Sequence, residues 1–369
     1  MTRPPGIPAA IDTPDILIDL DILERNIARM AETIRAKGLT LRPHAKTHKI
    51  PEIAALQLEA GAVGLTVATI GEAEVFAAAG VKDLFIAYPL WTSARKAERL
   101  RRLAGTATVA VGVDSPDGAA RLGAGLGPAA SRVGVLVEID SGHHRSGVHP
   151  GAAADVAQAA SDAGLKVAGI FTFPGHSYAP GMPAEAAAQE QEALRAAAES
   201  LAAAGFEATV RSGGSTPTAL LTNGPVATEV RPGVYVFGDA QQLELGRCGP
   251  EEIALTVAAT VVSHHEARPG MPERFIVDAG SKILGSDRPA WASGFGRLMD
   301  YPAARITALS EHHATVEWHG PGRMPALGAR LRVVPNHVCL AINLVDSAAV
   351  ISAGKNKGRW TVAARGKNA

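Results

Sequence analysis

The sequence predicts an α/β fold in two parts, a (β/α)8 TIM barrel followed by a mainly β C-terminal domain. Between residue 39 and about residue 240, apolar runs rich in β-branched residues alternate eight times with Ala-rich amphipathic segments. Runs that are apolar on both faces suit parallel strands covered by helices. Eight such units close a barrel, and no glycine-rich dinucleotide fingerprint supports the alternative, an open doubly wound sheet. After about residue 246, strand-like segments with short turns follow.

The elements follow in chain order. Residues 14–20 read as a short strand, and Asp21 is expected to cap the helix that follows. The barrel strands are predicted at residues 39–45, 63–69, 83–90, 106–114, 132–140, 166–173, 207–212 and 229–237. We expect a domain boundary near Gly246 to Gly249. This gives a barrel of residues 21–246 and a β domain of residues 247–369, with residues 1–20 completing its edge.

The composition limits the kinds of partner. The 369 residues can bury a large core, and 36 basic residues balance 36 acidic ones. No general electrostatic field therefore favours nucleic acid or a membrane surface, and the expected partners are small molecules and other subunits. The N-terminus lacks a signal-peptide core, and no stretch approaches the ~20 apolar residues of a membrane helix. With only Cys248 and Cys339, a disulfide framework is excluded, and we expect a cytoplasmic protein.

Lys46 is the first candidate for chemistry. It lies between His44 and His48 in the segment LRPHAKTHK, where the first predicted barrel strand ends. In a barrel of this kind, working residues sit where strands end and loops begin. A lysine in that position can form a Schiff base with a carbonyl cofactor or substrate. On its own, such a lysine is more often part of a solvated basic turn. A catalytic role therefore needs support from other residues of the chain.

A dense set of polar residues follows the other predicted strands. Its members are Thr69, Tyr88, Asp140, His143, His144, Arg145, His176, Ser177, Tyr178, the loop from Ser212 to Thr216, Tyr235 and Asp239. The small residues of SGGST would let backbone N–H groups approach a phosphate at a helix N-terminus. Together with Lys46, this loop suggests pyridoxal phosphate bound as an imine. Arg145 could bond the cofactor ring or form a salt bridge with Asp140.

A second motif suggests a metal ion. In PNHVC, His337 and Cys339 would point to the same side if the segment is a strand, and could hold one ion. Imidazole with thiolate suits Zn²⁺, with Mn²⁺ or Co²⁺ as alternatives. Two protein ligands leave open positions for water or substrate, as a catalytic site requires. An isolated H-x-C is more often a buried core pair.

These motifs together resemble the D-threonine aldolase and D-serine dehydratase family, which combines an alanine-racemase-like barrel with a β domain. The similarity runs from residue 13 to residue 366 and includes RPHAKTHK, EIDSGHHRSGV, SGGST, PGVYVFGD, DAGSK and PNHVC. It implies Lys46 as the Schiff-base lysine and His337 with Cys339 as ligands of Zn²⁺ or Mn²⁺. The implied cofactor contacts are His44, Thr69, Arg145, Ser212, Gly213, Gly214, Ser215, Thr216 and Tyr235; His176 and Tyr178 are the further catalytic candidates. A homodimer is also implied.

The resemblance implies a lyase that acts on β-hydroxy-D-amino acids and needs both pyridoxal phosphate and a divalent metal. The leading hypothesis is D-threonine aldolase, a retro-aldol cleavage to glycine and an aldehyde in which His176 or a metal-bound hydroxide takes the hydroxyl proton. The alternative is a D-serine or 3-hydroxy-D-amino-acid dehydratase that gives a 2-oxo acid and ammonia. Family aldolases carry Asp in place of Cys339 and a Tyr-His pair in place of Phe173-Pro174; Gln242 also fits a dehydratase. A non-catalytic pyridoxal-phosphate carrier and a racemase are rivals that need no metal.

Overall fold

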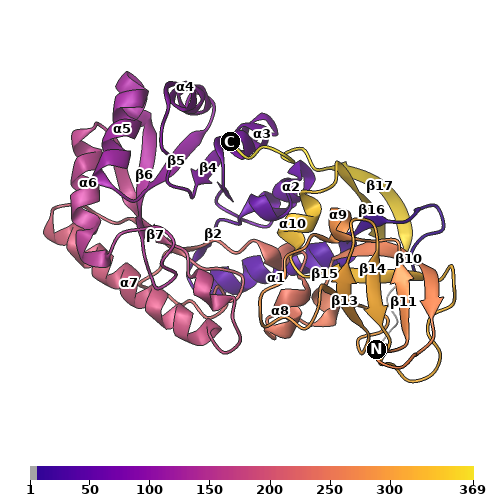
Figure 1. The fold of residues 1–369 in the computed structure, drawn as a ribbon. Helices are drawn as coiled ribbons and strands as arrows, with labels where there is room; N and C mark the ends of the chain where they lie inside the picture. Colours follow the sequence, from indigo (N-terminus) through magenta and orange to yellow (C-terminus); the bar gives the residue numbers. More distant parts are fainter. Residues whose placement is uncertain (1–5) are drawn as a thin grey trace. The chain divides into compact units, whose positions relative to one another are not determined.

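The computed structural model describes residues 6–369, and the chain forms two compact units. The barrel unit contains Ala28–Lys46, Pro51–Gly233 and Gly366–Ala369; the β unit contains the described residues up to Ile27, Thr47–Ile50 and Val234–Arg365. Residues 1–5 of the predicted N-terminal part lie outside the described residues. Figure 1 shows the ribbon in sequence colours.

The barrel unit contains the eight strands that the sequence predicts. They are β2 (Thr40–Leu41), β3 (Leu65–Val67), β4 (Asp83–Ile86), β5 (Thr108–Val113), β6 (Val133–Ile139), β7 (Lys166–Thr172), β8 (Val210–Gly213) and β9 (Glu229–Val230). All neighbours pair in parallel, in the order β2-β9-β8-β7-β6-β5-β4-β3. A bridge between His44 and Thr66 joins the first and last members of this order. The barrel prediction is therefore confirmed over the open sheet.

Helices cover the outside of these strands. They are α1 (Leu20–Ala36), which begins in the β unit, and α2 (Pro51–Glu59), α3 (Ile70–Ala78), α4 (Ala94–Leu103), α5 (Pro116–Leu126), α6 (Ala153–Asp162) and α7 (Pro183–Ala203). Figure 1 shows α4 to α7 around β4 to β7. Serine side chains cap α4 and α5 by accepting backbone N–H bonds, at Ser93 and Ser115. The strands are buried from both sides, which explains their continuous apolar runs.

The interior of the barrel unit combines aromatic packing with one buried cation. Phe85, Leu136 and Phe171 form a buried cluster, and the rings of Phe85 and Phe171 meet edge to face at 5.0 Å. The Arg231 guanidinium lies 5.6 Å and 5.3 Å from the centroids of these two rings. Its Nε donates to Ser212 Oγ at 2.8 Å. A buried cation needs such partners to offset its lost hydration.

The β unit is built on a nine-stranded sheet. Its strands are β1 (Asp15–Asp19), β10 (Leu255–His265), β11 (Arg274–Val277), β12 (Gly296–Leu298), β13 (Arg305–Leu309), β14 (Ala314–Glu317), β15 (Arg330–Pro335), β16 (Ser347–Ser352) and β17 (Lys355–Thr361), with short helices α8 (Ala240–Glu244), α9 (Ser281–Leu284) and α10 (Val338–Ile342). Seven of these strands follow the order β13-β14-β11-β10-β1-β16-β17, while β15 pairs with both β10 and β12. The expected edge position of the N-terminal strand is wrong, because β1 pairs with β10 on one side and β16 on the other.

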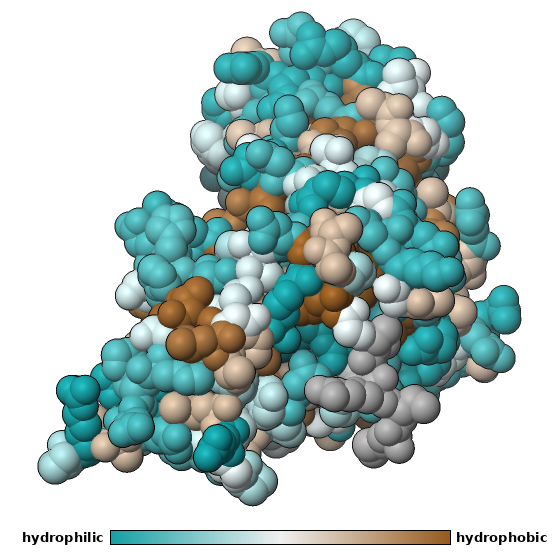
Figure 2. All heavy atoms as spheres, turned by 90° about the vertical axis from the view of Figure 1, so that its right-hand side faces the viewer, coloured by the Kyte–Doolittle hydropathy of each residue, from teal (hydrophilic) through white to brown (hydrophobic). Residues whose placement is uncertain are grey.

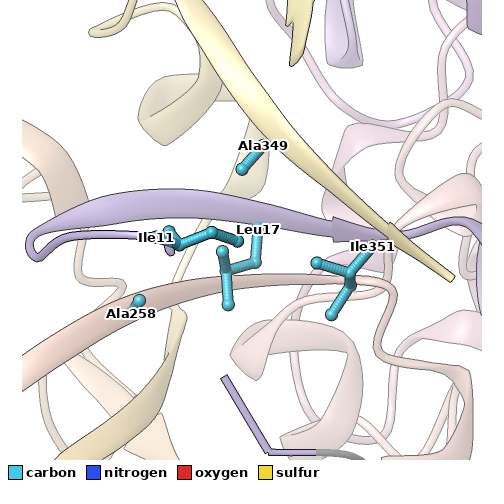
Figure 3. Close-up of a cluster of buried hydrophobic side chains, with 5 residues drawn as sticks. All are labelled: Ile11, Leu17, Ala258, Ala349 and Ile351. Atoms are coloured by element: carbon cyan, nitrogen blue, oxygen red, sulfur yellow. The ribbon is translucent and has the colours of Figure 1, made fainter. Parts of the chain in front are cut away.

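A small apolar cluster holds β1 in this central position. Leu17 and Ile11 pack with Ala258 of β10 and with Ala349 and Ile351 of β16 (Figure 3). All five side chains are buried. The inward-facing apolar residues of β1 thus have partners on both neighbouring strands, which explains why the first strand of the chain is not left at the edge.

The start of α1 also differs from the prediction. The helix begins at Leu20, and Asp19 caps it by accepting from the Ile22 N–H at 3.1 Å. Asp21 instead accepts from the Ser352 hydroxyl and the Ala353 N–H, both at 2.8 Å. These bonds lower the pKa of Asp21. Asp21 is therefore not the cap of α1, as predicted; it binds the turn at the end of β16.

Figure 2 shows one face of the molecule, on which hydrophilic residues predominate and hydrophobic residues occur in separate groups. Within residues 6–369, no helix is both long enough and apolar enough to cross a membrane.

Candidate active site

Lys46 lies just beyond the carboxyl end of β2. The short 3₁₀ helix η1 (Ala45–Thr47) turns the chain there, and the Lys46 N–H faces His44 Nδ1 at 3.4 Å. The Lys46 Nζ lies 5.7 Å from the centroid of the Phe173 ring, which follows β7. The Lys46 amine, after the first barrel strand, thus lies near the Phe173 ring, which follows the sixth predicted strand.

Phe173 is a common neighbour of several strand-end side chains. The Arg145 guanidinium lies 5.1 Å from the centroid of its ring, and the rings of His143 and Tyr178 lie 5.6 Å and 6.4 Å away. The structure therefore brings three predicted site residues, Lys46, Arg145 and Tyr178, around one ring. His143 was noted among the polar strand-end residues, but neither it nor Phe173 was given a role in catalysis or cofactor binding. The sequence signals for Phe173 are its place at the end of a barrel strand and its difference from the family aldolases.

The loop after β6 shows which partner Arg145 has. The Asp140 carboxylate accepts from the N–H groups of Gly142 and His144 and lies 2.7 Å from His144 Nδ1. Arg145 lies instead 3.9 Å from Glu138, a buried carboxylate at the end of β6. Burial raises the pKa of Glu138. The alternative of an Arg145–Asp140 salt bridge is therefore wrong, since Asp140 is occupied by its own loop.

His176 lies in the loop after β7, on the short 3₁₀ helix η4 (Gly175–Ser177). Its Nε2 is 2.8 Å from the Gln189 side-chain oxygen of α7, and its Nδ1 is buried without a hydrogen-bond partner among the described residues. Burial, with Arg145 and His176 nearby, lowers the pKa of His143. A largely neutral His143 beside His176 could accept a proton at neutral pH.

The SGGST loop uses much of its polar capacity within the protein. The Ser212 hydroxyl donates to Glu229 at 2.6 Å and accepts from Arg231. The Gly214 N–H donates to Glu190 of α7 at 2.5 Å, and the Ser215 N–H donates to the Thr218 hydroxyl at 2.9 Å. These three residues of the predicted phosphate loop therefore bind other parts of the protein, and these bonds hold the loop in place.

One group of the loop is left without a partner. The Thr216 hydroxyl oxygen is buried and has no hydrogen-bond partner among the described residues. An orphaned hydroxyl is costly unless a ligand or water satisfies it. A phosphate beside a loop with two glycines would supply that acceptor, while Lys46 and Arg145 at the strand ends provide an amine and a fixed cation. These residues fit pyridoxal phosphate.

Two predicted cofactor contacts have other surroundings. Thr69 caps α3 by accepting from the Glu72 N–H, and its hydroxyl donates to the Lys367 carbonyl oxygen at 2.5 Å. Both bonds are structural. Tyr235 belongs to the β unit, where it is buried in the 3₁₀ helix η5 (Val234–Val236).

The predicted metal pair lies in the β unit, but not on a strand. β15 ends at Pro335; His337 is the residue before α10 and Cys339 lies inside that helix. Asp239, fully buried, accepts from the Val338 N–H at 3.4 Å and lies 3.6 Å from His337 Nδ1. The alternation expected for a strand is therefore wrong. A helix that starts against Asp239 places the two side chains instead.

The charges around this pair favour a cation. Burial lowers the pKa of His337, but the neighbouring Cys339 and Asp239 outweigh burial and raise its pKa well above the usual value. The Cys339 thiol lies 3.3 Å from the hydroxyl of Thr47, the residue that follows Lys46 in the chain. Within residues 6–369, no group of three or more His, Cys, Asp or Glu residues is arranged to hold a metal. Imidazole and thiolate together fit a two-ligand divalent site with open positions.

Comparisons with known proteins define the class. The family model "Alanine racemase, N-terminal domain" matches residues 18–241, and the model "Putative serine dehydratase domain" matches residues 254–351. The chain is thus an enzyme with an alanine-racemase-like barrel and a serine-dehydratase-type β domain. The fold-class prediction is confirmed in both parts.

Individual relatives narrow this class. The chain is 38% identical to D-threo-3-hydroxyaspartate dehydratase of Delftia sp. over 89% of its length and 91% of that protein, and 34% identical to D-threonine aldolase of Arthrobacter sp. over 98% and 95%. A solved histidine-to-alanine variant of D-threo-3-hydroxyaspartate dehydratase matches with a TM-score of 0.87, at 34% identity over 97% of this chain and 96% of that one. A cysteine-to-alanine variant, described in a metal-free form, matches with a TM-score of 0.85 at 34% identity over 95% and 97%. The chain belongs to the family of these lyases, as its sequence motifs predicted.

Proposed function

We propose that this protein is a lyase that uses pyridoxal phosphate and a divalent metal to dehydrate β-hydroxy-D-amino acids to 2-oxo acids and ammonia. The observation that favours dehydration is the pair His337 and Cys339. The histidine and cysteine replaced in the two dehydratase variants are also two positions apart, and the cysteine variant is described in a metal-free form. This support favours the dehydratase over the aldolase that the sequence placed first.

The side chains around Phe173 have distinct roles in this proposal. Pyridoxal phosphate supplies an electron sink for the charge that develops at Cα of the substrate. Lys46 would anchor it, and after the substrate amine has displaced Nζ from the cofactor, the freed Nζ would take the Cα proton. Arg145 holds the charge state of the cofactor ring, because a guanidinium stays protonated. Tyr178, whose ring lies near that of Phe173, would orient the amino acid.

The leaving hydroxyl needs a separate acid. A divalent ion held by His337 and Cys339 would supply a Lewis acid for that hydroxyl. Asp239 would orient the His337 imidazole, as carboxylates beside metal-bound histidines do. His176 keeps a buried Nδ1 that can hold a proton released during the reaction.

Retro-aldol cleavage is the second candidate. The chain matches D-threonine aldolase of Arthrobacter sp. along nearly its whole length, which is the observation that favours it. In that reaction the hydroxyl proton rather than the Cα proton is removed, and His176, whose Nδ1 has no hydrogen-bond partner among the described residues, would accept it. The two reactions share the cofactor and differ in the bond that breaks.

The products decide between these reactions. The purified protein is incubated with D-threo-3-hydroxyaspartate, D-threonine and D-serine, with and without a chelator. We expect chelator-sensitive release of ammonia and a 2-oxo acid. Release of glycine with an aldehyde would show that the protein is an aldolase instead. Turnover that a chelator leaves intact would show that the reaction needs no metal. Absence of any turnover would favour the carrier.

Two variants test the named residues. Lys46→Ala should abolish the visible absorbance of the bound imine, and a retained band would exclude Lys46 as the anchor. Cys339→Asp restores the residue that family aldolases carry. We expect it to retain metal but shift the product ratio toward glycine; an unchanged ratio would mean that Cys339 does not select the reaction.

A further inference from the structure

Glu190 is a buried carboxylate with no place in the proposed reaction. It lies within the Ala-rich helix α7, and its residue is 0% exposed. Glutamate is among the residues least often buried, because the charged form loses its hydration. Its position therefore calls for a specific partner.

That partner is the backbone of the SGGST loop. Glu190 Oε1 accepts from the Gly214 N–H at 2.5 Å. A Cβ built on Gly213 would collide with the same oxygen, and Gly214 has a φ of +78°, which favours glycine. Glu190 thus accounts for the glycine at position 213, whose space it fills, and it binds the N–H of Gly214.

The surrounding charges allow this arrangement. Burial raises the pKa of Glu190 to about 7, while the Gly214 N–H and the Arg231 guanidinium act in the opposite direction. Glu190 Oε2 has no hydrogen-bond partner among the described residues. Arg231 is fully buried between the elements that carry Ser212 and Thr172, to both of which it donates.

We infer that Glu190 is a positioning residue that holds the Gly214 N–H away from the phosphate, so that the Thr216 hydroxyl faces the phosphate of the cofactor. The inference rests on the proposed use of pyridoxal phosphate. Within the SGGST loop, the Gly214 amide is then a structural group and Thr216 a ligand-binding one. The loop is preorganised before cofactor binds, which lowers the entropic cost of binding.

The test compares the affinities for pyridoxal phosphate and for pyridoxal, which lacks the phosphate. Glu190→Gln keeps an acceptor for Gly214, whereas Glu190→Met keeps the volume and removes the acceptor. We expect pyridoxal phosphate affinity to fall about tenfold in the Met variant and about twofold or less in the Gln variant, with pyridoxal affinity unchanged in both. Glu199→Gln, on the exposed side of α7, is the control and should match the wild type.

The outcomes separate the two proposals. If the wild-type protein binds pyridoxal phosphate but the Met variant binds it equally well, the role of Glu190 is wrong and the cofactor stands. If the wild type does not bind pyridoxal phosphate, the cofactor itself is wrong. Should the Met variant not fold, amide hydrogen exchange in the wild type answers the question. The Gly214 amide should exchange slowly before cofactor is added; protection that arises only with cofactor would overturn the inference.

Discussion

Replacing Glu190 by glutamine should make the stability of the cofactor-free protein less dependent on pH. The pKa of Glu190 is about 7 in the folded protein against an ordinary value of 4.5. The folded state therefore binds the proton more tightly than the unfolded state, and its stability falls as pH rises from about 4.5 to about 7. Raising the pH from about 5 to about 8 therefore lowers the free energy of unfolding by about 2–3 kcal/mol through this single group. Glutamine does not ionise and escapes that cost.

The assay is urea unfolding of wild type and Glu190→Gln, followed by far-UV circular dichroism at several pH values. The glutamine NH₂ takes the place of an oxygen without a partner, which adds a penalty of about 1–3 kcal/mol at every pH. The diagnostic quantity is therefore the change in the stability difference with pH rather than its sign. We expect the stability of the variant relative to wild type to rise by about 2–3 kcal/mol across this range. A difference that stays constant with pH would refute the burial argument.

Three further changes test the packing and the charges. Gly169 has a φ of +148°, and a Cβ there would collide with the Val210 carbonyl oxygen, so Gly169→Ala should destabilise the barrel by more than about 3 kcal/mol in urea unfolding. The control Gly80→Ala, at a left-handed but open position, should cost about 1 kcal/mol. Arg231→Met removes the cation next to the buried carboxylate of Glu190. Thermal unfolding should show that the free energy of unfolding falls by about 3–5 kcal/mol. Asp239→Asn keeps the helix cap but removes its charge, and dye competition should show metal affinity reduced about 10–100-fold; unchanged affinity would exclude its orienting role.

The barrel strands were predictable in number but not in length. Each of the eight apolar runs overlaps an observed strand, because strands buried on both faces carry a strong apolar signal. The runs at 39–45 and 229–237 contain only two strand residues each. Pro43 and Pro232 interrupt them, since proline has no N–H to donate to a neighbouring strand.

The site was predictable where residues follow strand ends and not where distant contacts decide. Lys46 and Arg145 could be found from their places after strands. The position of Cys339 on a helix could not, because Asp239 helps start that helix from 99 residues earlier in the chain. Glu190 was hidden for a similar reason: in an Ala-rich helix a glutamate reads as solvent-exposed, and its Gly214 partner is close only after folding.

The central place of β1 has a consequence for the order in which the chain can acquire its structure. β1 is made first, yet its two partners, β10 and β16, lie beyond residue 254 and residue 346. During synthesis, the eight strands of the barrel emerge before either partner is available. The N-terminal strand thus spends most of translation with both edges unsatisfied, a period in which it can pair with other chains. A nascent chain interrupted before residue 255 would lack both partners, and β1 would stay exposed at both edges.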